Sequence, residues 1–355
     1  MVVNRHFWFG KNVFLTGHTG FKGGWLALWL SEMGAKVHGY ALAPLTYPSF
    51  YEVSRLADRL ASNTISDIRD GNALNSALLV AKPEVVLHLA AQPLVRNSYY
   101  APVETYDVNV MGTVNLFEAV RKSRSIKAVV NVTTDKCYLN KERNTPYAED
   151  EPIGGYDPYS SSKACSELVT LAYRKSFLGA YGIALASARA GNVIGGGDWS
   201  ADRLLPDFFR AIDAGEVLNI RYPNAIRPWQ HVLEPLSGYL NLAERLYVER
   251  DAFAEAWNFG PKETDSCSVE QLLENLRIRL PAASWQCDAT SQPHEAGILL
   301  LDSSKAKKRL AWSSIWNIEE ALEKVVDWHI AWKKGSCMQE FSLKQISTYE
   351  KVLNS

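Results

Sequence analysis

A tyrosine and a lysine four positions apart, Tyr159 and Lys163, are candidates for acid–base chemistry. Asp157 can cap a helix here and Pro158 can begin it, so the two side chains would share one helix face. A phenol beside an ammonium loses its proton more readily, because the positive charge favours the phenolate. The pair therefore predicts a group that takes the proton of an alcohol during oxidation, although such pairs also occur on protein surfaces.

A glycine-spaced turn near the start of the chain could bind the oxidant. It follows the apolar run Val13-Phe14-Leu15 and opens an amphipathic stretch, and its glycines are Gly17, Gly20 and Gly23. The turn would therefore join a strand to a helix, where backbone N–H groups hold a dinucleotide pyrophosphate. Together the two motifs predict a nicotinamide-dependent enzyme.

The order of elements that must position these motifs predicts an α/β fold. Short β-rich runs at 12–16, 36–41, 85–90, 128–134 and 184–188 alternate with helices that begin at Phe21, Asn72, Pro102 and Pro158. Such alternation predicts right-handed βαβ units and a doubly wound parallel sheet of the Rossmann type. Ligands then gather at the carboxyl ends of the strands.

The alternation fails after Arg189, which predicts a smaller, mostly C-terminal substrate lobe. The segment 257–260 reads as a last strand that returns to the sheet, and 318–332 has the period of a packing helix. We expect a dinucleotide-binding domain of residues 1–190 with 226–260. Residues 191–225 with 261–355 would form the substrate domain.

Composition argues against several other classes of function. The formal net charge is −1 and the Lys and Arg residues are scattered, so neither nucleic acid nor a membrane is expected as a partner. No stretch is long enough to span a bilayer, and the polar start lacks the core of a secretion signal. Five cysteines at wide spacing predict neither disulfides nor a metal site, so we expect a cytoplasmic protein.

These motifs resemble those of the extended short-chain dehydrogenase/reductase superfamily, and within it the nucleotide-sugar 4,6-dehydratases. The resemblance covers nearly the whole chain, through Gly17-x-x-Gly20-x-x-Gly23, Asp67-Ile68-x-Asp70, His88-Leu89-Ala90-Ala91-Gln92, Thr133-Thr134-Asp135-Lys136, Tyr159-x-x-x-Lys163, Arg189-x-x-Asn192, Arg227-Pro228-Trp229-Gln230-His231-Val232 and Asn258-Phe259-Gly260. Within this group, the chain is most similar to the branch that acts on CDP-D-glucose. This similarity rests on Thr134 to Tyr138, on His18 with Lys22 in the glycine turn, and on Gln292-Pro293-His294-Glu295.

The resemblance implies a reaction in which Tyr159 takes the C4 hydroxyl proton while hydride passes to NAD. Thr134 would donate to the C4 oxygen, Asp135 would protonate the C6 hydroxyl as it leaves, and the hydride would return to C6. In the commonest pattern of these dehydratases a Glu follows the Asp, whereas in this chain Lys136 follows Asp135. Lys136 would remove the C5 proton when neutral or stabilise an enolate by its charge. It could also merely pair with Asp135 or a phosphate.

The cofactor contacts that the motifs and the resemblance imply are Gly17, His18, Gly20, Phe21, Lys22, Gly23, Tyr40, Asp67, Ile68, Ala90, Ala91, Gln92, Tyr159 and Lys163. An NAD-binding fold usually places a carboxylate about twenty residues after the glycines to hold the ribose. Tyr40, Ala41 and Leu42 stand there instead. NAD is expected on family grounds, with His18 and Lys22 as possible substitutes for the carboxylate. For the substrate diphosphate we expect Asn192, Arg203 and Arg227.

Two alternatives remain open at this point. One is a related enzyme, either a nucleotide-sugar 4-epimerase or a dehydratase of another nucleotide sugar. The other is a non-catalytic NAD-sensing protein that keeps the fold without turnover. The resemblance also implies a homodimer or homotetramer formed through the helices near 105–121 and 159–177, and a place in deoxysugar synthesis for a surface polysaccharide of the O-antigen type.

Overall fold

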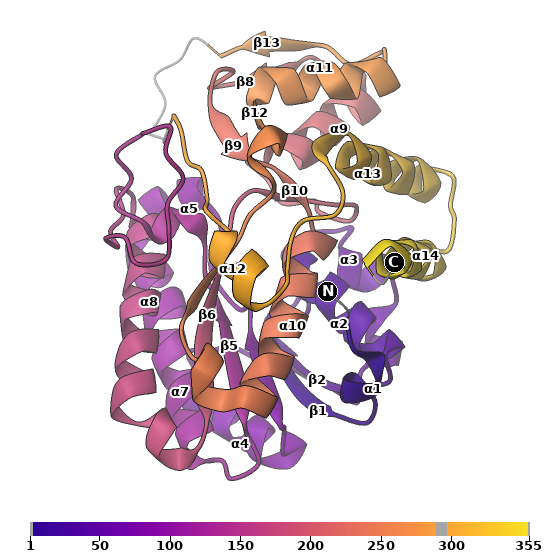
Figure 1. Cartoon of the computed structure of the whole chain (residues 1–355). Helices are drawn as coiled ribbons and strands as arrows, with labels where there is room; N and C mark the ends of the chain where they lie inside the picture. Colours follow the sequence, from indigo (N-terminus) through magenta and orange to yellow (C-terminus); the bar gives the residue numbers. More distant parts are fainter. Residues whose placement is uncertain (1–2, 289–296, 354–355) are drawn as a thin grey trace.

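A seven-stranded sheet forms the centre of the computed structural model, which describes residues 3–288 and 297–353. The strand order is β11-β6-β5-β4-β1-β2-β3, and all pairs are parallel (Figure 1). The strands are β1 (Asn12–Thr16), β2 (Lys36–Ala41), β3 (Ser62–Ile65), β4 (Val85–His88), β5 (Ala128–Val132), β6 (Ala184–Ala190) and β11 (Ala256–Phe259). The order reverses at β1, which pairs with both β2 and β4, and this confirms the predicted doubly wound fold.

Helices cover both faces of this sheet, because alternate strand residues point to opposite sides. Val13 and Leu15 face one core, with α2 (Phe21–Glu32) and α10 (Leu233–Glu249). Phe14 faces the other core, against α4 (Gly71–Ala81), α7 (Gly112–Lys122) and Leu178. On that second side also run α5 (Val95–Tyr100), α6 (Pro102–Tyr106), the π-helical turn Asp107–Met111 and α8 (Pro158–Ser176).

The strands end where the chain turns toward ligand-binding loops. The strands predicted at 85–90 and 128–134 are each two residues shorter in the structure, since β4 ends at His88 and β5 ends at Val132. Leu89 N–H donates to Thr16 O at 3.2 Å, and the N–H groups of both Leu89 and Ala90 donate to Thr16 Oγ1 at 3.1 Å. The edge strand β3 escaped prediction because its sequence Ser-Asn-Thr-Ile is mostly polar and exposed.

A second lobe lies above the sheet in Figure 1 and has its own apolar core, which includes Phe208, Leu272 and Leu322. Its strands form three pairs: β7 (Val193–Ile194) with β10 (Gln230–His231), β8 (Leu218–Ile220) with β13 (Trp285–Cys287), and β9 (Ile226–Pro228) with β12 (Ser266–Ser268). Its helices are α9 (Leu204–Ala214), α11 (Val269–Arg279) and α13 (Ile318–Lys333). The predicted helix at 318–332 is thus confirmed, with Ala321, Val325 and Trp328 buried.

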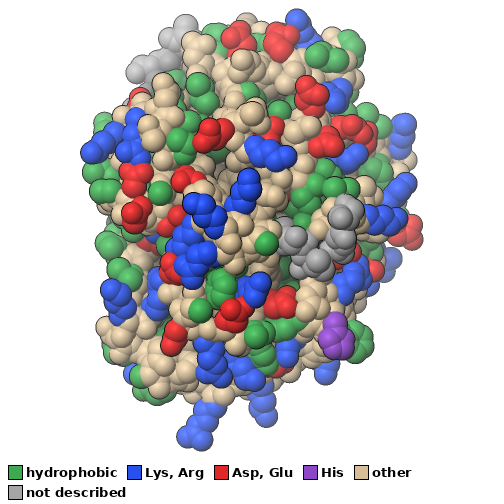
Figure 2. All heavy atoms as spheres, viewed as in Figure 1, with side chains coloured by type: hydrophobic (Ala, Val, Ile, Leu, Met, Phe, Trp, Pro, Cys, Tyr) green, Lys and Arg blue, Asp and Glu red, His purple; other side chains and the backbone are tan. Residues whose placement is uncertain are grey.

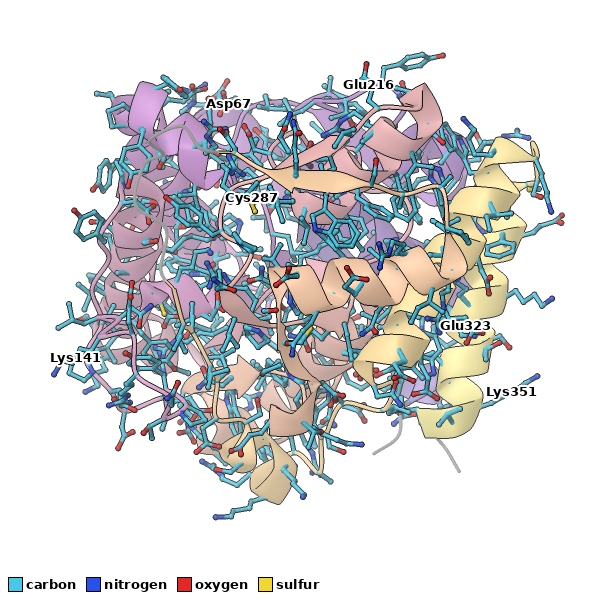
Figure 3. All side chains as sticks on the ribbon, turned by 90° about the horizontal axis from the view of Figure 1, so that it is seen from above. Asp67, Lys141, Glu216, Cys287, Glu323 and Lys351 are labelled. Carbon is cyan, nitrogen blue, oxygen red and sulfur yellow. The ribbon has the colours of Figure 1, made fainter. Side chains whose placement is uncertain are left out.

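The last helix, α14 (Met338–Leu353), packs beside α13 and also contacts α2. Viewed from above, Glu323 of α13 and Lys351 of α14 lie on one side of the molecule, opposite Lys141 (Figure 3). Trp29 Nε1 donates to Glu350 Oε1 at 2.9 Å, which ties α14 to α2. The predicted limits of the two domains stay a prediction, and α14 contacts both lobes.

Short elements complete the described chain: α1 (Arg5–Trp8), α3 (Phe50–Val53), α12 (Ser304–Arg309) and the 3-10 turns Leu56–Arg59, Asp135–Cys137, Leu178–Tyr181, Arg250–Phe253 and Glu263–Asp265. Charges of both signs are interspersed over the face shown in Figure 2, as the net charge of −1 suggests. Within residues 3–288 and 297–353, no helix is long and apolar enough to cross a membrane.

Candidate active site

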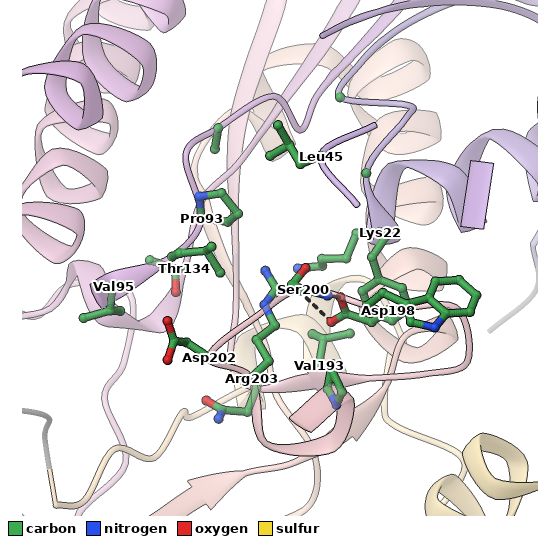
Figure 4. Close-up of a pocket in the computed structure, with 18 of the residues that line it drawn as sticks. Lys22, Leu45, Pro93, Val95, Thr134, Val193, Asp198, Ser200, Asp202 and Arg203 are labelled. Atoms are coloured by element: carbon green, nitrogen blue, oxygen red, sulfur yellow. Dashed lines mark hydrogen bonds and ion pairs between the residues drawn. The ribbon is translucent and has the colours of Figure 1, made fainter. Parts of the chain in front are cut away.

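A cavity of about 500 Å³ lies between the two lobes at the carboxyl ends of the sheet strands. Residues that follow β1, β4, β5 and β6 line one side of it, and residues of the second lobe line the other. Figure 4 shows part of this lining, with Lys22 and Thr134 from the sheet side and Asp198 and Arg203 from the second lobe. The structure therefore brings the predicted motifs together at the switch point of the sheet.

The glycine turn fits a dinucleotide because two of its positions leave no room for a side chain. A Cβ on Gly17 would lie 2.7 Å from Ala90 N, and Gly17 has φ +79°. A Cβ on Gly23 would lie 2.0 Å from Gly17 O. The N-cap of α2 is Gly20, so no side chain covers the first-turn N–H groups that a pyrophosphate needs.

The end of the cavity beside β2 lacks the carboxylate that usually holds the ribose of NAD. Tyr40, Ala41, Asp67 and Ile68 line it. The Asp67 carboxylate is 2.6 Å from Arg69, and hydrogen bonding to this guanidinium lowers the pKa of Asp67. Tyr40 OH donates to the Asp67 carbonyl oxygen at 2.9 Å. The residue that caps α4 is Asp70 and not Asp67, which lines the cavity.

Two of the predicted cofactor contacts point elsewhere. His18 Nε2 is bonded to Asn63 Oδ1 at 2.8 Å, and its ring fills the space where a Cβ on Gly39 would lie. Gln92 Nε2 donates to Leu94 O and to Thr105 Oγ1. Neither side chain lines the cavity, whereas Ala90 and Ala91 do. His18 and Gln92 thus brace the loops that form the site.

Lys22 lies close to Lys163 and Asp135 in the cavity. Its Nζ donates to Tyr239 OH at 3.3 Å. Burial, then the charges of Arg203 and Lys163, lower the pKa of Lys22 to about 7. The position predicted to replace a ribose carboxylate therefore adds a titratable amine near Lys163 and Asp135.

Tyr159 and Lys163 lie one turn apart on α8, as predicted, and Asp157 caps this helix through a 2.9 Å bond from Ser160 N. Both side chains are buried. Burial raises the pKa of Tyr159 to about 12, against the lowering effects of Thr134 and Arg203. Burial lowers the pKa of Lys163 to about 8, and its Nζ donates to Val132 O at 3.2 Å. Desolvation thus raises the pKa of this phenol more than Thr134 and Arg203 lower it, whereas the sequence led us to expect a phenol that ionises readily.

Thr134, Asp135 and Lys136 form a compact turn directly after β5. Thr134 Oγ1 donates to Asp135 Oδ1 at 2.9 Å and accepts from Lys136 N at 3.3 Å. Asp135 is 1% exposed, and its Oδ2 is buried with no hydrogen-bond partner among the described residues. Burial raises the pKa of Asp135 although Lys136, Thr134 and Arg227 oppose this. A carboxyl that holds its proton is suited to donate it to a leaving hydroxyl.

Behind these residues lies a buried ion pair that the site prediction did not include. Arg189 Nη2 is 2.9 Å from Glu167 Oε2, and each side chain is 2% exposed. Glu167 also accepts from Thr133 Oγ1 at 2.5 Å and from Ser187 Oγ at 2.6 Å. Glu167 follows Lys163 by one helical turn, and that spacing is the signal by which sequence reasoning could have found it.

The predicted diphosphate contacts Asn192, Arg203 and Arg227 all line the cavity. Arg203 Nη1 is 2.8 Å from Asp198 Oδ2. Arg227 is 5% exposed and its Nη1 donates to the carbonyl oxygens of Ile226 and Gly297. The segment Gln292 to Glu295, which supported the cytidine branch, lies outside the described residues.

Two further arginines that the sequence did not single out, Arg96 and Arg221, also line the cavity. Arg96 lies four residues after Gln92, so its closeness to the motif that follows β4 is the signal by which the sequence could have identified it. Arg221 follows β8, a three-residue strand too short to be predicted.

Comparison with known proteins agrees with this geometry. Residues 14–325 match the family described as GDP-mannose 4,6 dehydratase. CDP-glucose 4,6-dehydratase of Salmonella typhimurium is 52% identical over 354 residues, which is 98% of each chain. dTDP-glucose 4,6-dehydratase of Xanthomonas campestris is 27% identical over 94% of this chain and 97% of its own.

Solved structures share the fold at lower identity. An epimerase from Methanothermobacter thermautotrophicus superposes with a TM-score of 0.80 at 22% identity, covering 93% of this chain and 95% of its own. A UDP-glucose-4-epimerase from Stenotrophomonas maltophila, solved with NAD and formylated UDP-arabinopyranose, superposes with a TM-score of 0.77 at 19% identity. The match covers 92% of this chain and 100% of its own. At these identities the likeness concerns the fold.

The missing ribose carboxylate leads to a prediction about Ala41, the last residue of β2, which lines the cavity. Wild-type protein should bind NAD only modestly and be purified partly without it. Ala41→Asp should tighten NAD binding about tenfold, the effect of one added hydrogen bond to a charged acceptor. Titration calorimetry measures this, with Ala43→Asp as the control on the same cavity wall. An unchanged affinity, or stoichiometric NAD in dialysed wild-type protein, would show that other residues hold the ribose.

Proposed function

The chain belongs to the GDP-mannose 4,6-dehydratase family, and we propose that it converts CDP-D-glucose to CDP-4-keto-6-deoxy-D-glucose and water. The match of 52% over 98% of both chains to a CDP-glucose 4,6-dehydratase is the observation that carries the choice of substrate. The product would feed deoxysugar synthesis for a surface polysaccharide. All five cysteines are unpaired, which fits work in a reducing cytoplasm.

NAD is the cofactor we propose for this site. The first-turn N–H groups after Gly20 would hold the pyrophosphate, and Tyr40, Asp67 and Ile68 would contact the adenosine. When bound, NAD takes up a hydride from C4 of the sugar and returns it to C6. The remaining steps are proton transfers, and they fall to side chains of this protein.

Tyr159 would take the C4 hydroxyl proton, with Thr134 donating a hydrogen bond to the same oxygen. Both side chains line the cavity, and Thr134 is itself hydrogen-bonded to Tyr159. Arg203 also favours the ionised phenol, whereas Asp135 disfavours it. A protonated Asp135 removes that opposing charge, so the two groups are suited to hold opposite protonation states.

Asp135 would protonate the hydroxyl that leaves C6, and Lys136 would remove the C5 proton or stabilise the enolate that results. C5 regains a proton as the hydride reaches C6, which gives the 4-keto-6-deoxy sugar. The ketone at C4 acidifies the C5 proton, so elimination follows oxidation. A 4-epimerase needs neither of these two groups. The buried Asp135 with its unpartnered Oδ2 among the described residues therefore favours a dehydratase over an epimerase.

Isotope transfer tests the proposed reaction. Substrate carrying deuterium at C4 should give product carrying deuterium at C6, because one bound cofactor is reduced and reoxidised in each turnover. A mixture of labelled and unlabelled substrate should show no exchange between molecules by mass spectrometry. Accumulation of one equivalent of reduced cofactor in solution per turnover would contradict the dehydratase assignment.

Variants of three residues should stop the reaction at different points. Tyr159→Phe should prevent the transient absorbance of reduced cofactor near the start of turnover. Asp135→Asn and Lys136→Ala should keep that signal but lose elimination by about 10² to 10⁴, the usual effect of removing a general acid or base. Lys141→Ala, on the loop after this turn, is a control. Near-normal turnover of Lys136→Ala would show that Lys136 is structural.

We also propose that the protein forms a homodimer or homotetramer through the helices at 105–121 and 159–177, which comprise the π-helical turn, α7 and α8. These elements contact one another and expose apolar side chains, among them Met111 at 48% and Leu168 at 54%. Such residues usually mark an interface when they cluster. Leu168→Glu should lower the mass measured by sedimentation to that of a monomer, whereas Ile278→Glu on α11 should not. A monomeric wild-type protein at micromolar concentration would disprove the proposal.

A further inference from the structure

Three charged side chains meet at the cavity where the two lobes face each other. Asp202 Oδ1 is 2.9 Å from Arg96 Nη1 and 3.4 Å from Arg221 Nη1. Arg96 belongs to α5, which follows the central strand β4, and Arg221 follows β8 of the second lobe. All three residues line the cavity. One carboxylate therefore bridges guanidinium groups from opposite walls.

The loop that carries Asp202 is held on both sides of this residue. Arg203 pairs with Asp198, and Ser200 N donates to Asp198 Oδ1 at 3.0 Å. Arg210 Nη1 donates to Trp199 O at 3.0 Å. In Figure 4 the Asp202 carboxylate is drawn on the side of Val95, the first residue of α5, and apart from the Arg203 side chain. The Asp202 carboxylate thus pairs with Arg96, whereas the adjacent Arg203 pairs with Asp198.

Asp202 lies in a turn with φ +60°, in the left-handed region that aspartate adopts more readily than most residues with a Cβ. Its ion pairs with Arg96 and Arg221 connect this turn to α5 and to the residue that follows β8.

The charges at this point suit a diphosphate better than a carboxylate. Two guanidinium groups face one carboxylate, and the nearby Asp207 is already paired with Arg210. Phosphate oxygens accept from guanidinium groups in the same geometry as carboxylate oxygens do. A diphosphate ester has one charge on each phosphorus, so it can satisfy both arginines at once.

We propose that Asp202 is an internal substitute for the diphosphate of the substrate. Binding of the nucleotide sugar transfers Arg96 and Arg221 from the Asp202 carboxylate to phosphate oxygens. Since the product keeps the same diphosphate, the reverse exchange assists its release. This inference rests on the proposed function to the extent that the substrate must be a nucleoside diphosphate sugar.

Binding of CDP to the NAD-saturated protein tests the role of Asp202. Asp202→Asn removes the competing charge and should bind CDP about three- to tenfold more tightly, the range for releasing two partly exposed ion pairs. The affinity for inorganic pyrophosphate should rise to a similar degree. The affinity for cytidine, which has no phosphate, should not change. The control is Asp58→Asn, which breaks the exposed Arg55–Asp58 ion pair outside the cavity.

A double-variant cycle tests whether Asp202 acts through Arg96. Arg96→Met should weaken CDP binding, and Asp202→Asn added to it should give a smaller gain than in the wild-type background. Equal or weaker binding of CDP by Asp202→Asn, or an equal gain in cytidine binding, would overturn the proposal. An undiminished gain in the Arg96→Met background would overturn it as well.

The two proposals fail in distinguishable ways when CDP, UDP, GDP and dTDP are all measured. Preference of wild-type protein for another nucleotide would contradict the choice of CDP-glucose and leave the comparison of Asp202 variants valid with that nucleotide. Equal affinities of wild type and Asp202→Asn for the preferred nucleotide would contradict the role of Asp202 alone.

Discussion

The relative positions of Tyr159, Thr134 and Asp135 depend on the buried ion pair between Arg189 of β6 and Glu167 of α8. Burial of two charges is costly unless their remaining hydrogen bonds are made, and removal of one partner typically costs about 3–5 kcal/mol. Here Glu167 also accepts from Thr133 and Ser187, and Arg189 Nη1 donates to Tyr138 OH. The pair therefore sets how α8 lies along β5 and β6.

This placement brings together groups that are distant in the sequence. Tyr159 and Lys163 belong to α8 and lie about two turns and one turn, respectively, before Glu167. Thr134 and Asp135 follow Thr133, which donates to the same carboxylate. A small shift of α8 along the sheet would separate the two sets, so the ion pair acts on the geometry of the reaction without touching the cavity itself.

Burial also sets the proton affinities of the site, in opposite directions for acids and bases. It raises the pKa of Asp135 and Tyr159, and it lowers the pKa of Lys22 and Lys163. Each shift favours the neutral form of its group, as expected when charges leave water. A site of this kind responds strongly to any charge that a ligand brings, because little solvent is present to screen it.

Local sequence determined those features whose causes are local. The bounds of β1 and β2, the cap at Asp157 and the turn at Gly17 depend on apolar patterning, on a side chain three residues from its partner and on the lack of a Cβ. The resemblance added the roles of Tyr159 and its neighbours in the proposed reaction.

Only the tertiary structure decided which side chains face the cavity. His18 and Gln92 stand in the predicted motifs, yet their side chains contact Asn63 and Thr105, because β3 and α6 pack beside them and supply these hydrogen-bond partners. Arg96 and Asp202 are 106 positions apart and meet because the second lobe folds over the sheet. Contacts of that kind come from the packing of whole elements, and no spacing along the chain encodes them.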